Sequence, residues 1–445
     1  MSLLTTGIGL AKKTKRKFKK VIEGNKPVYL SKVRRLERVQ TDEKVCAMTF
    51  DDGPMNKPCS NDINGAPLTL SLLQSLEKYK ARGTFDIVGD TSNNYPDVAG
   101  EHGSASWGGV KFDHYPDINE DKLGGAVHCP ELVARILSGG HQITNHTYSH
   151  VLFGKKPLVY GKRTYLQNVD EVVDDLQKLH DLLKEKFNYE MKFSRPPHYV
   201  DKIEGGFTSY DAYEKMGYQY MAASYDGAGW LPCATYEEEV KATYEHIAKL
   251  LAEDPNALCG QIIFQKDGYN MARRTPIADG LPQQLEILNQ YGYKVVTVEE
   301  LCEYSPFTDI GKKDEIYEAA LKLVEKGYVI VYRDNKIKPE MPLIMGELAM
   351  MLCGNEGFAI RFEALKKNPA GFFGNVKIKH PYSGAIKAAA DKGYLPLQGK
   401  KFNMEAKVNA QTFNNACEKA FGRNAAVKGN VIDHKTAIIA LAKLI

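Results

Sequence analysis

Short β-rich hydrophobic runs alternate with longer stretches of helical period between residues 44 and about 300. In the longer stretches apolar residues recur every three or four positions, as on one face of an amphipathic helix. Strands separated by helices pair in parallel, so this region predicts an α/β fold, either a doubly wound sheet or a barrel. The predicted strands are residues 45–49, 84–88, 142–145, 192–195, 218–224, 261–265 and 294–297, and the predicted helices are 68–80, 131–138, 168–186, 236–252 and 281–291.

Two regions depart from this alternation of strands and helices. Residues 90–129 are polar and rich in Gly and Tyr, which predicts a long loop insertion. From about residue 308 two similar blocks follow, with landmarks 65 or 66 positions apart, and the tail at 431–444 resembles a partial third. Chance similarity of two helical hairpins is the alternative to a repeat.

We therefore expect three parts: a basic N-terminal segment (1–40), an α/β domain (41–307) and a small, mostly helical C-terminal module (308–445). Because the α/β domain and the module differ in net charge and in residue pattern, the α/β domain is expected to fold without the module.

The net charge of +4 conceals a strong asymmetry. Residues 1–40 hold 12 basic and 2 acidic residues, residues 41–310 hold 25 and 40, and residues 311–445 hold 22 and 13. The acidic body argues against nucleic acid as a substrate. The basic ends suit an anionic polymer or membrane surface, or they are simply solvated.

Targeting signals are not apparent in the chain. No apolar run approaches the ~18–20 residues of a membrane span. The basic run at residues 12–20 follows the short apolar stretch instead of preceding it, as it would in a secretory signal. As written, the protein either stays inside the cell or begins after a removed leader or anchor.

Eight cysteines are spread thinly, with no Cys-x-x-Cys pair. This pattern predicts buried free thiols rather than a disulfide framework or a cysteine-type zinc site. A bridge between Cys46 and Cys59 stays open at this point.

Reactive side chains gather where predicted strands end. Asp51 and Asp52 directly follow the first strand, and adjacent carboxylates repel each other unless a cation lies between them. A plain surface turn is the alternative. His146 and His150 follow the third strand, and histidines four apart on one helical face can bind one metal. Together with a strand-end carboxylate they predict a catalytic metal site with open positions for water.

Three more clusters follow strands. Arg195 ends the fourth, Asp226 and Trp230 follow the fifth, and Lys266 ends the sixth. Ligands and catalytic groups gather at the carboxyl ends of parallel strands, and independent surface turns would not all fall on that edge. For Arg195 alone, which precedes two prolines, a structural role is the alternative.

In this order, the five clusters resemble the motifs of the NodB-homology polysaccharide deacetylases, carbohydrate esterase family 4, over roughly residues 40–305. The motif stretches are Thr49–Pro54, Gly140–His150, Phe193–Tyr199, Asp226–Trp230 and Ile262–Gly268.

The resemblance implies a distorted (β/α) barrel and a divalent metal, usually zinc, with cobalt, nickel or manganese as alternatives. It implies Asp52, His146 and His150 as metal ligands. It also implies Asp51 as general base with Arg195 orienting it, the Tyr199 backbone N–H as oxyanion donor, and Trp230 as a wall of the acetyl pocket.

The fifth motif departs from the family, which has His-Asp where this chain has Lys266 and Asp267. In the family that histidine is the general acid and pairs with the aspartate of the fourth motif, here Asp226. Lys266 partnered by Asp226 is one candidate donor in this chain, and His198 is another.

The C-terminal blocks resemble degenerate S-layer homology repeats, with Ile344 and Met345 where such repeats have Thr-Arg. That resemblance implies an anionic cell-wall polymer as partner, and a purely structural appendage is the alternative.

The predicted function is a metal-dependent hydrolase that removes N-acetyl groups from a cell-wall or chitin-like polysaccharide, outside the cell or at the wall. An O-acetyl esterase of the xylan type and a non-catalytic wall-binding protein are the alternatives.

Overall fold

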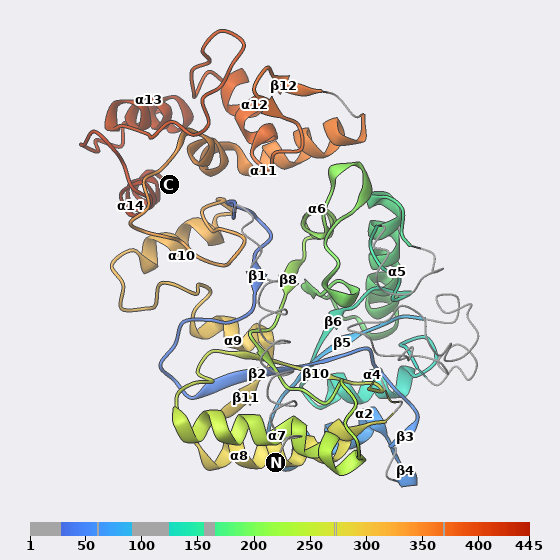
Figure 1. The fold of residues 1–445 in the computed structure, drawn as a ribbon. Coiled ribbons are helices and arrows are strands. Elements are labelled where there is room, and N and C mark those ends of the chain that lie inside the picture. The colour runs from blue at the N-terminus through green and yellow to red at the C-terminus, as the bar shows by residue number, and fades with distance from the viewer. Residues whose placement is uncertain are drawn as a thin grey trace, which may run out of the picture.

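A computed structural model describes residues 28–59, 62–90, 124–154, 165–270, 272, 274–367 and 370–445 (Figure 1). The basic run at residues 12–20 and most of the predicted insertion at 90–129 lie outside these residues. The described chain forms an α/β domain on one large sheet, and a helical C-terminal module that lies at one end of it.

The central sheet has nine strands in the order β1-β8-β7-β6-β5-β2-β10-β9, with β11 paired to β2. Every pairing in it is parallel. Just after β1, Val39 N donates to Gly260 O (2.8 Å), so this part of the chain meets the start of β10. This sheet confirms the predicted distorted (β/α) barrel. Its strands are β1 (Arg35–Leu36), β2 (Val45–Asp51), β5 (Thr84–Ile87), β6 (Gln142–Asn145), β7 (Phe193–Ser194), β8 (Gln219–Met221), β9 (Tyr225–Asp226), β10 (Ile262–Lys266) and β11 (Lys294–Val296), and β3 (Pro58–Cys59) pairs separately with β4 (Asp62–Pro67).

Strand β2 lies between β5 and β10 in the sheet, and its whole length is buried. Its near-continuous apolar sequence is typical of a parallel strand covered on both faces. Phe50 stacks on Phe85 of β5, with ring centroids 5.0 Å apart. This packing fixes the position of Asp51 at the end of the strand.

Amphipathic helices cover the sheet close to where their period predicted them. One differs: α8 begins at Pro276, not at 281, because Gly280 and Pro282 interrupt its apolar pattern. A Cβ on Gly280 would lie 1.9 Å from Thr243 Oγ1 of α7, so this helix contact requires glycine. None of the described helices has the length and apolarity to cross a membrane. The helices of this domain are α2 (Leu68–Lys78), α4 (Pro130–Ser138), α5 (Val169–Phe187), α6 (Ser209–Met216), α7 (Tyr236–Glu253), α8 (Pro276–Gln290) and α9 (Val298–Tyr304), with short 3-10 turns η2 (Pro197–Tyr199) and η3 (Glu204–Gly206).

The C-terminal module is built around a closed ring of three backbone hydrogen bonds. Leu343 N donates to Ile432 O (2.8 Å), Ile432 N to Val408 O (2.8 Å), and Val408 N to Leu343 O (2.9 Å). Each of these buried residues stands two positions before a helix. The elements of the module are α10 (Tyr317–Glu325), α11 (Met345–Lys366), β12 (Gly371–Phe373), β13 (Val376–Lys377), α12 (Ser383–Asp391), α13 (Ala410–Phe421) and α14 (His434–Leu444).

The module packs against the α/β domain. Arg361 of α11 forms a buried ion pair with Asp211 of α6. Phe362 meets Phe207 edge-on, with centroids 5.2 Å apart, and belongs to the same buried cluster as the barrel core. A buried ion pair and a shared apolar cluster therefore join the two parts. That residues 41–307 fold without the module stays a prediction.

The described part of the basic N-terminal segment joins these two bodies. Strand β1 extends the sheet beside β8, while Ser31 N donates to Val331 O (2.9 Å) and Arg35 N donates to Arg333 O in the module. Leu30 is buried in the hydrophobic core of the module. Residues 28–40 are thus part of the packed structure.

All eight cysteines lie within the described residues, and no disulfide joins them. Five of them are buried, as expected for thiols that fill the core. The bridge between Cys46 and Cys59 that the sequence left open is not formed.

Candidate active site

The register of the sheet places four polar side chains in one row. Lys266 of β10 pairs with Asp51 of β2, Asp51 with Asp86 of β5, and Asp86 with Thr144 of β6. Directly paired residues of parallel strands point to the same face. The row lies at the carboxyl ends of the strands, the edge where the sequence predicted the chemistry.

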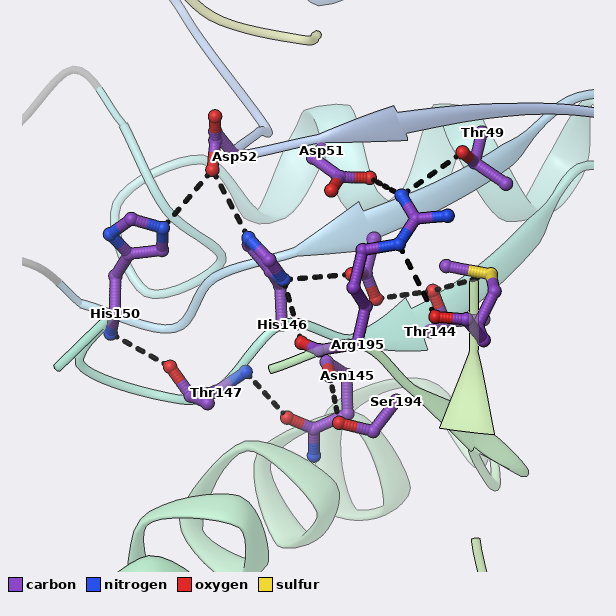
Figure 2. A network of polar contacts seen from close by, with 12 residues as sticks. Thr49, Asp51, Asp52, Thr144, Asn145, His146, Thr147, His150, Ser194 and Arg195 are labelled. Carbon is purple, nitrogen blue, oxygen red and sulfur yellow. Dashed lines mark hydrogen bonds and ion pairs between the residues drawn. The ribbon is translucent and has the colours of Figure 1, made fainter. Parts of the chain in front are cut away.

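The chain turns sharply at Asp52, directly after β2. Its φ of 84° is a left-handed value that non-glycine residues rarely adopt, and such backbone strain concentrates at functional sites. Gly53 follows in close contact with Asp267, since a Cβ on Gly53 would lie 2.0 Å from the Asp267 carboxylate. The turn directs the Asp52 carboxylate toward two histidines (Figure 2).

His146 and His150 converge on one oxygen of Asp52. The Nε2 atom of each ring lies 3.2 Å from Asp52 Oδ1, and the ring centroids are 5.1 Å apart (Figure 2). The expected helical spacing is wrong, because these residues form a turn after β6 with Thr147 and His150 at positive φ. His150 N donates to Thr147 Oγ1 (2.9 Å), which holds the turn closed.

These three residues fit a divalent cation. Four ligands placed tetrahedrally around zinc lie about 3.3 Å from one another. The observed separations of 3.2 Å from each Nε2 to Asp52 Oδ1 match that spacing. His146 Nδ1 lies 2.9 Å from Arg195 O, which orients the ring so that Nε2 faces Asp52. All three side chains are buried.

The electrostatics of Asp52 and His150 agree with a ligand role, whereas a cation at His146 would compete with a proton. Burial would raise the pKa of Asp52, but Lys266 and both histidines hold this pKa well below its usual range, so the carboxylate is ionised. Burial lowers the pKa of His150 to about 4, which leaves the neutral imidazole that binds metals. Burial also opposes protonation of His146, but Asp86 and Asp52 raise its pKa well above the usual value.

Asp51 and Arg195 form a second buried pair beside this triad. Arg195 Nη1 contacts Asp51 Oδ1 and donates to Thr49 Oγ1 (3.1 Å). The backbone carbonyls of Met221 and Ala222 accept from Nε (3.3 Å) and Nη2 (3.1 Å). Burial raises the pKa of Asp51 to about 6, against the opposing charge of Arg195. The guanidinium is thus fixed and holds Asp51 in one orientation.

Lys266 and Asp226 lie in different contacts. Lys266 Nζ forms an ion pair with Asp52 Oδ2, on the side away from the histidines' shared oxygen. Asp226 accepts from Trp230 Nε1, which lies 3.0 and 3.2 Å from its two oxygens, and from Ala228 N (2.9 Å). The structure therefore pairs Trp230 with Asp226, and it brings Lys266 to the predicted metal ligand.

Tyr199 lies in the turn after β7. Its backbone N–H donates to Pro196 O (2.9 Å). To donate to an oxyanion, this N–H must either share its hydrogen between the two acceptors or break its bond to Pro196 O. Its ring lies over the Arg195 guanidinium, with 5.5 Å from Cζ to the centroid. His198, the second candidate acid, has its ring 5.4 Å from that of His150 and so stands at the same rim.

Sequence reasoning missed Asp86 and Thr144. Asp86 Oδ2 lies 2.8 Å from His146 Nδ1, and Thr144 Oγ1 donates to Asp86 Oδ1 (2.5 Å). The available signal was an acidic residue in the middle of an apolar strand, Thr84–Ile87. Thr69, also missed, donates to the Asp267 carboxylate (2.7 and 2.8 Å).

Comparison with known proteins gives one family match. Residues 38–221 match the model of the polysaccharide deacetylase family. This stretch contains the first three motifs, whereas Asp226 and Lys266 lie beyond it.

Two relatives and one solved structure illustrate the likeness. A peptidoglycan-N-acetylglucosamine deacetylase of Bacillus cereus is 27% identical over 271 residues, which are 60% of this chain and 92% of that protein. The peptidoglycan-N-acetylmuramic acid deacetylase PdaC of Bacillus subtilis is 24% identical over 290 residues, 65% of this chain but only 45% of its own length. A structure of PdaC from Bacillus subtilis aligns at 22% identity with a TM-score of 0.38, covering 60% of this chain and 93% of that one.

Proposed function

We propose that the region matching the polysaccharide deacetylase family is a metal-dependent hydrolase that removes N-acetyl groups from a cell-wall polysaccharide. Both relatives described above are named peptidoglycan deacetylases, which supports peptidoglycan as the substrate and the wall or the cell exterior as the place of action. Zinc is the proposed metal, because two imidazoles and one carboxylate are a donor set that zinc favours.

One observation carries the proposal: a buried Asp-His-His triad stands beside a buried aspartate that an arginine holds in place. The triad alone accounts for the binding of a cation but supplies no base. The adjacent Asp51–Arg195 pair adds a base. Because Asp51 is in register with Lys266 and Asp86, all these groups lie at one edge of the sheet.

The residues of the chain divide the chemistry among them. A divalent ion held by Asp52, His146 and His150 would acidify a coordinated water and polarise the acetyl carbonyl. Asp51 accepts the proton of the attacking water, and a pKa near the working pH suits a general base. Arg195 keeps the Asp51 carboxylate oriented for that transfer.

The leaving nitrogen needs a proton donor, because an amide cannot expel its nitrogen as an anion. Lys266 and His198 are the two candidates at the rim of the site. An ester has a better leaving group and tolerates a weak donor. Lysine at the place of the family's histidine is therefore the observation that keeps an O-acetyl esterase as the second candidate function.

For the C-terminal module we propose three structurally related units that bind an anionic wall polymer. The ring of hydrogen bonds at residues 343, 408 and 432 supports three equivalent units. The excess of basic residues after residue 310 supports an anionic partner.

An acetate-release panel on the metal-loaded full chain tests the enzyme proposal. Chitooligosaccharides, peptidoglycan and acetylated xylan are the substrates, and Asp51→Asn is the matched inactive variant. Release from peptidoglycan or chitooligosaccharides by the wild type alone supports N-deacetylation, and release only from xylan supports the esterase. No release from any substrate, with metal bound, favours the non-catalytic wall-binding alternative.

A further inference from the structure

Asp86 is a buried carboxylate that the packing of the sheet does not require. It lies within β5 between Phe85 and Ile87, and it is 0% exposed. A buried carboxylate is unfavourable unless its oxygens are bonded. Thr144 Oγ1 donates to Oδ1 (2.5 Å). Oδ2 makes no well-aligned hydrogen bond within the described residues, and the atom it approaches is His146 Nδ1, 2.8 Å away.

His146 therefore has a carboxylate beside each ring nitrogen. Nε2 lies 3.2 Å from Asp52 Oδ1, and Nδ1 lies 2.8 Å from Asp86 Oδ2. The carbonyl oxygen of Arg195 is a second acceptor at Nδ1, at 2.9 Å. Two acceptors at Nδ1 hold one ring proton there, so that Nε2 is the nitrogen whose lone pair can face a cation beside Asp52 and His150.

We propose that Asp86 is a positioning residue for the cation site, which fixes the tautomer and the orientation of His146 and adds negative charge behind it. The inference deepens the proposed function, and it depends on that function only for a divalent cation at Asp52, His146 and His150. Acceptors in this place beside metal-binding histidines are typically worth 10–100-fold in metal affinity.

A second cation between Asp51, Asp86 and His146 is the competing explanation, since these three also bring ligand atoms within 4.8 Å of one another. Arg195 argues against it. Its guanidinium contacts Asp51 Oδ1 and already supplies positive charge at that place.

The test measures cation affinity of the full chain and needs no substrate. Zn²⁺ and Co²⁺ are titrated in competition with a chromophoric chelator, and the visible absorption of bound Co²⁺ reports the ligand geometry. Asp86→Asn keeps the shape and removes the charge, so the dissociation constant is expected to rise 10–100-fold and the Co²⁺ spectrum to change. Asp211→Asn is the matched control, because it removes an equally buried carboxylate at the contact with the C-terminal module. It is expected to bind as the wild type does.

Thr144→Val is the second variant, since it removes the donor that holds Asp86 Oδ1. This variant is expected to weaken cation binding as well, by a smaller factor. If Asp86→Asn does not fold, the cation affinity of Thr144→Val tests the inference. Wild-type affinity in Asp86→Asn, or in Thr144→Val where only that variant folds, overturns the inference. Two cations bound per chain would favour the competing explanation. A wild type that binds one cation but releases no acetate defeats the proposed function alone, and a wild type that binds none defeats both.

Discussion

At the scale of residues, the site holds three carboxylates against two fixed cations. Asp51, Asp52 and Asp86 face Arg195 and Lys266, and none of these side chains is more than 14% exposed. Opposite charges so poorly hydrated attract strongly, and an unbalanced charge among them is unfavourable. The excess is negative and lies where two histidine nitrogens converge. A negative excess in this place attracts a cation.

The first prediction concerns the ligands. His150→Ala should lower the metal content from about one ion per chain to near zero, because three protein ligands leave no redundancy. The measurement is elemental analysis after dialysis against trace metal. His198→Ala is the matched control, since its ring lies 5.4 Å from that of His150 but outside the ligand set. Equal metal content in His150→Ala and the wild type would contradict the assignment.

The second prediction concerns the proton donor. If Lys266 protonates the leaving nitrogen, Lys266→Ala should lower kcat on an N-acetyl sugar by about 10²-fold or more and spare an activated acetate ester. Because Lys266 Nζ contacts Asp52, the variant should hold its metal at least as tightly as the wild type. Parallel steady-state kinetics on both substrates, with metal analysis, separate the two effects.

His198→Ala in the same pair of assays tests the other candidate. Selective loss on the amide in His198→Ala, with Lys266→Ala unaffected, would assign the acid to His198. Unchanged amide hydrolysis in both variants would rule out both donors and leave water or Asp267 to supply the proton.

The grouping of Asp52, His146 and His150 could be predicted from the sequence, because each of them follows a strand end that the pattern revealed. Asp86 could not, because it contacts His146 only through the register of β5 and β6, which no local pattern encodes. The ion pair of Lys266 with Asp52 could not be predicted either, because Asp52 reaches Lys266 only through its left-handed turn.

At the scale of elements, the sequence predicted most of the sheet. All seven predicted strands of the α/β domain are present, and most of them are apolar runs of the kind that buried parallel strands have. Strands β1 and β9 were missed. Each has only two residues, as has β7, which lies inside the predicted strand 192–195. The helix α6 was missed as well, since its eight residues place several polar side chains in buried contacts.

The third prediction concerns a polar cluster that joins α11 to α14. His434 Nε2 lies 3.0 Å from Glu347 Oε2, Tyr332 OH contacts Glu347 Oε1, and Lys338 Nζ lies 3.9 Å from the centroid of the Tyr332 ring. Burial would raise the pKa of Glu347, but its bonds to His434 and Tyr332 hold this pKa below the ordinary 4.5. A carboxyl group with a lowered folded pKa stabilises the fold above its unfolded pKa, and that contribution is lost as the pH falls through the folded value.

The free energy of unfolding should therefore fall below about pH 4.5 in the wild type. Glu347→Gln should cost about 1.5–3 kcal/mol at pH 7 and show a shallower decline in acid. Urea unfolding of the full chain at a series of pH values measures both. Glu325→Gln, an exposed change in α10, is the control and should follow the wild type. An acid decline in Glu347→Gln as steep as that of the wild type would show that other groups cause it.

At the scale of the whole molecule, the N-terminal strap and α11 connect the two bodies. Here the strap means residues 28–40, which pair with the sheet through β1 and with the module at residues 331–333. Figure 1 shows the module at one end of the α/β domain, beside α6. The module boundary near residue 308 was predicted from net charge and residue pattern. These describe each part separately and carry no information on the buried contacts between them.

The last prediction concerns this contact, and two ion pairs of α11 provide a matched comparison. Arg361 pairs with Asp211 in the buried contact, with side chains 6% and 4% exposed, whereas Lys366 pairs with Asp170 at 2.8 Å with side chains 38% and 57% exposed. Removing one partner of a buried pair leaves the other charge buried and costs about 3–5 kcal/mol. An exposed pair contributes about 1 kcal/mol or less.

Arg361→Ala should thus destabilise the full chain several times more than Lys366→Ala in urea unfolding. A chain ending at residue 307 should be less stable still, since it also exposes Phe207. If the chain ending at residue 307 and the α/β domain of the full chain unfold at the same urea concentration, the contact contributes nothing and the module is an independent appendage after all. If they do not, the module is a structural part of the molecule, and the position of β1 depends on it.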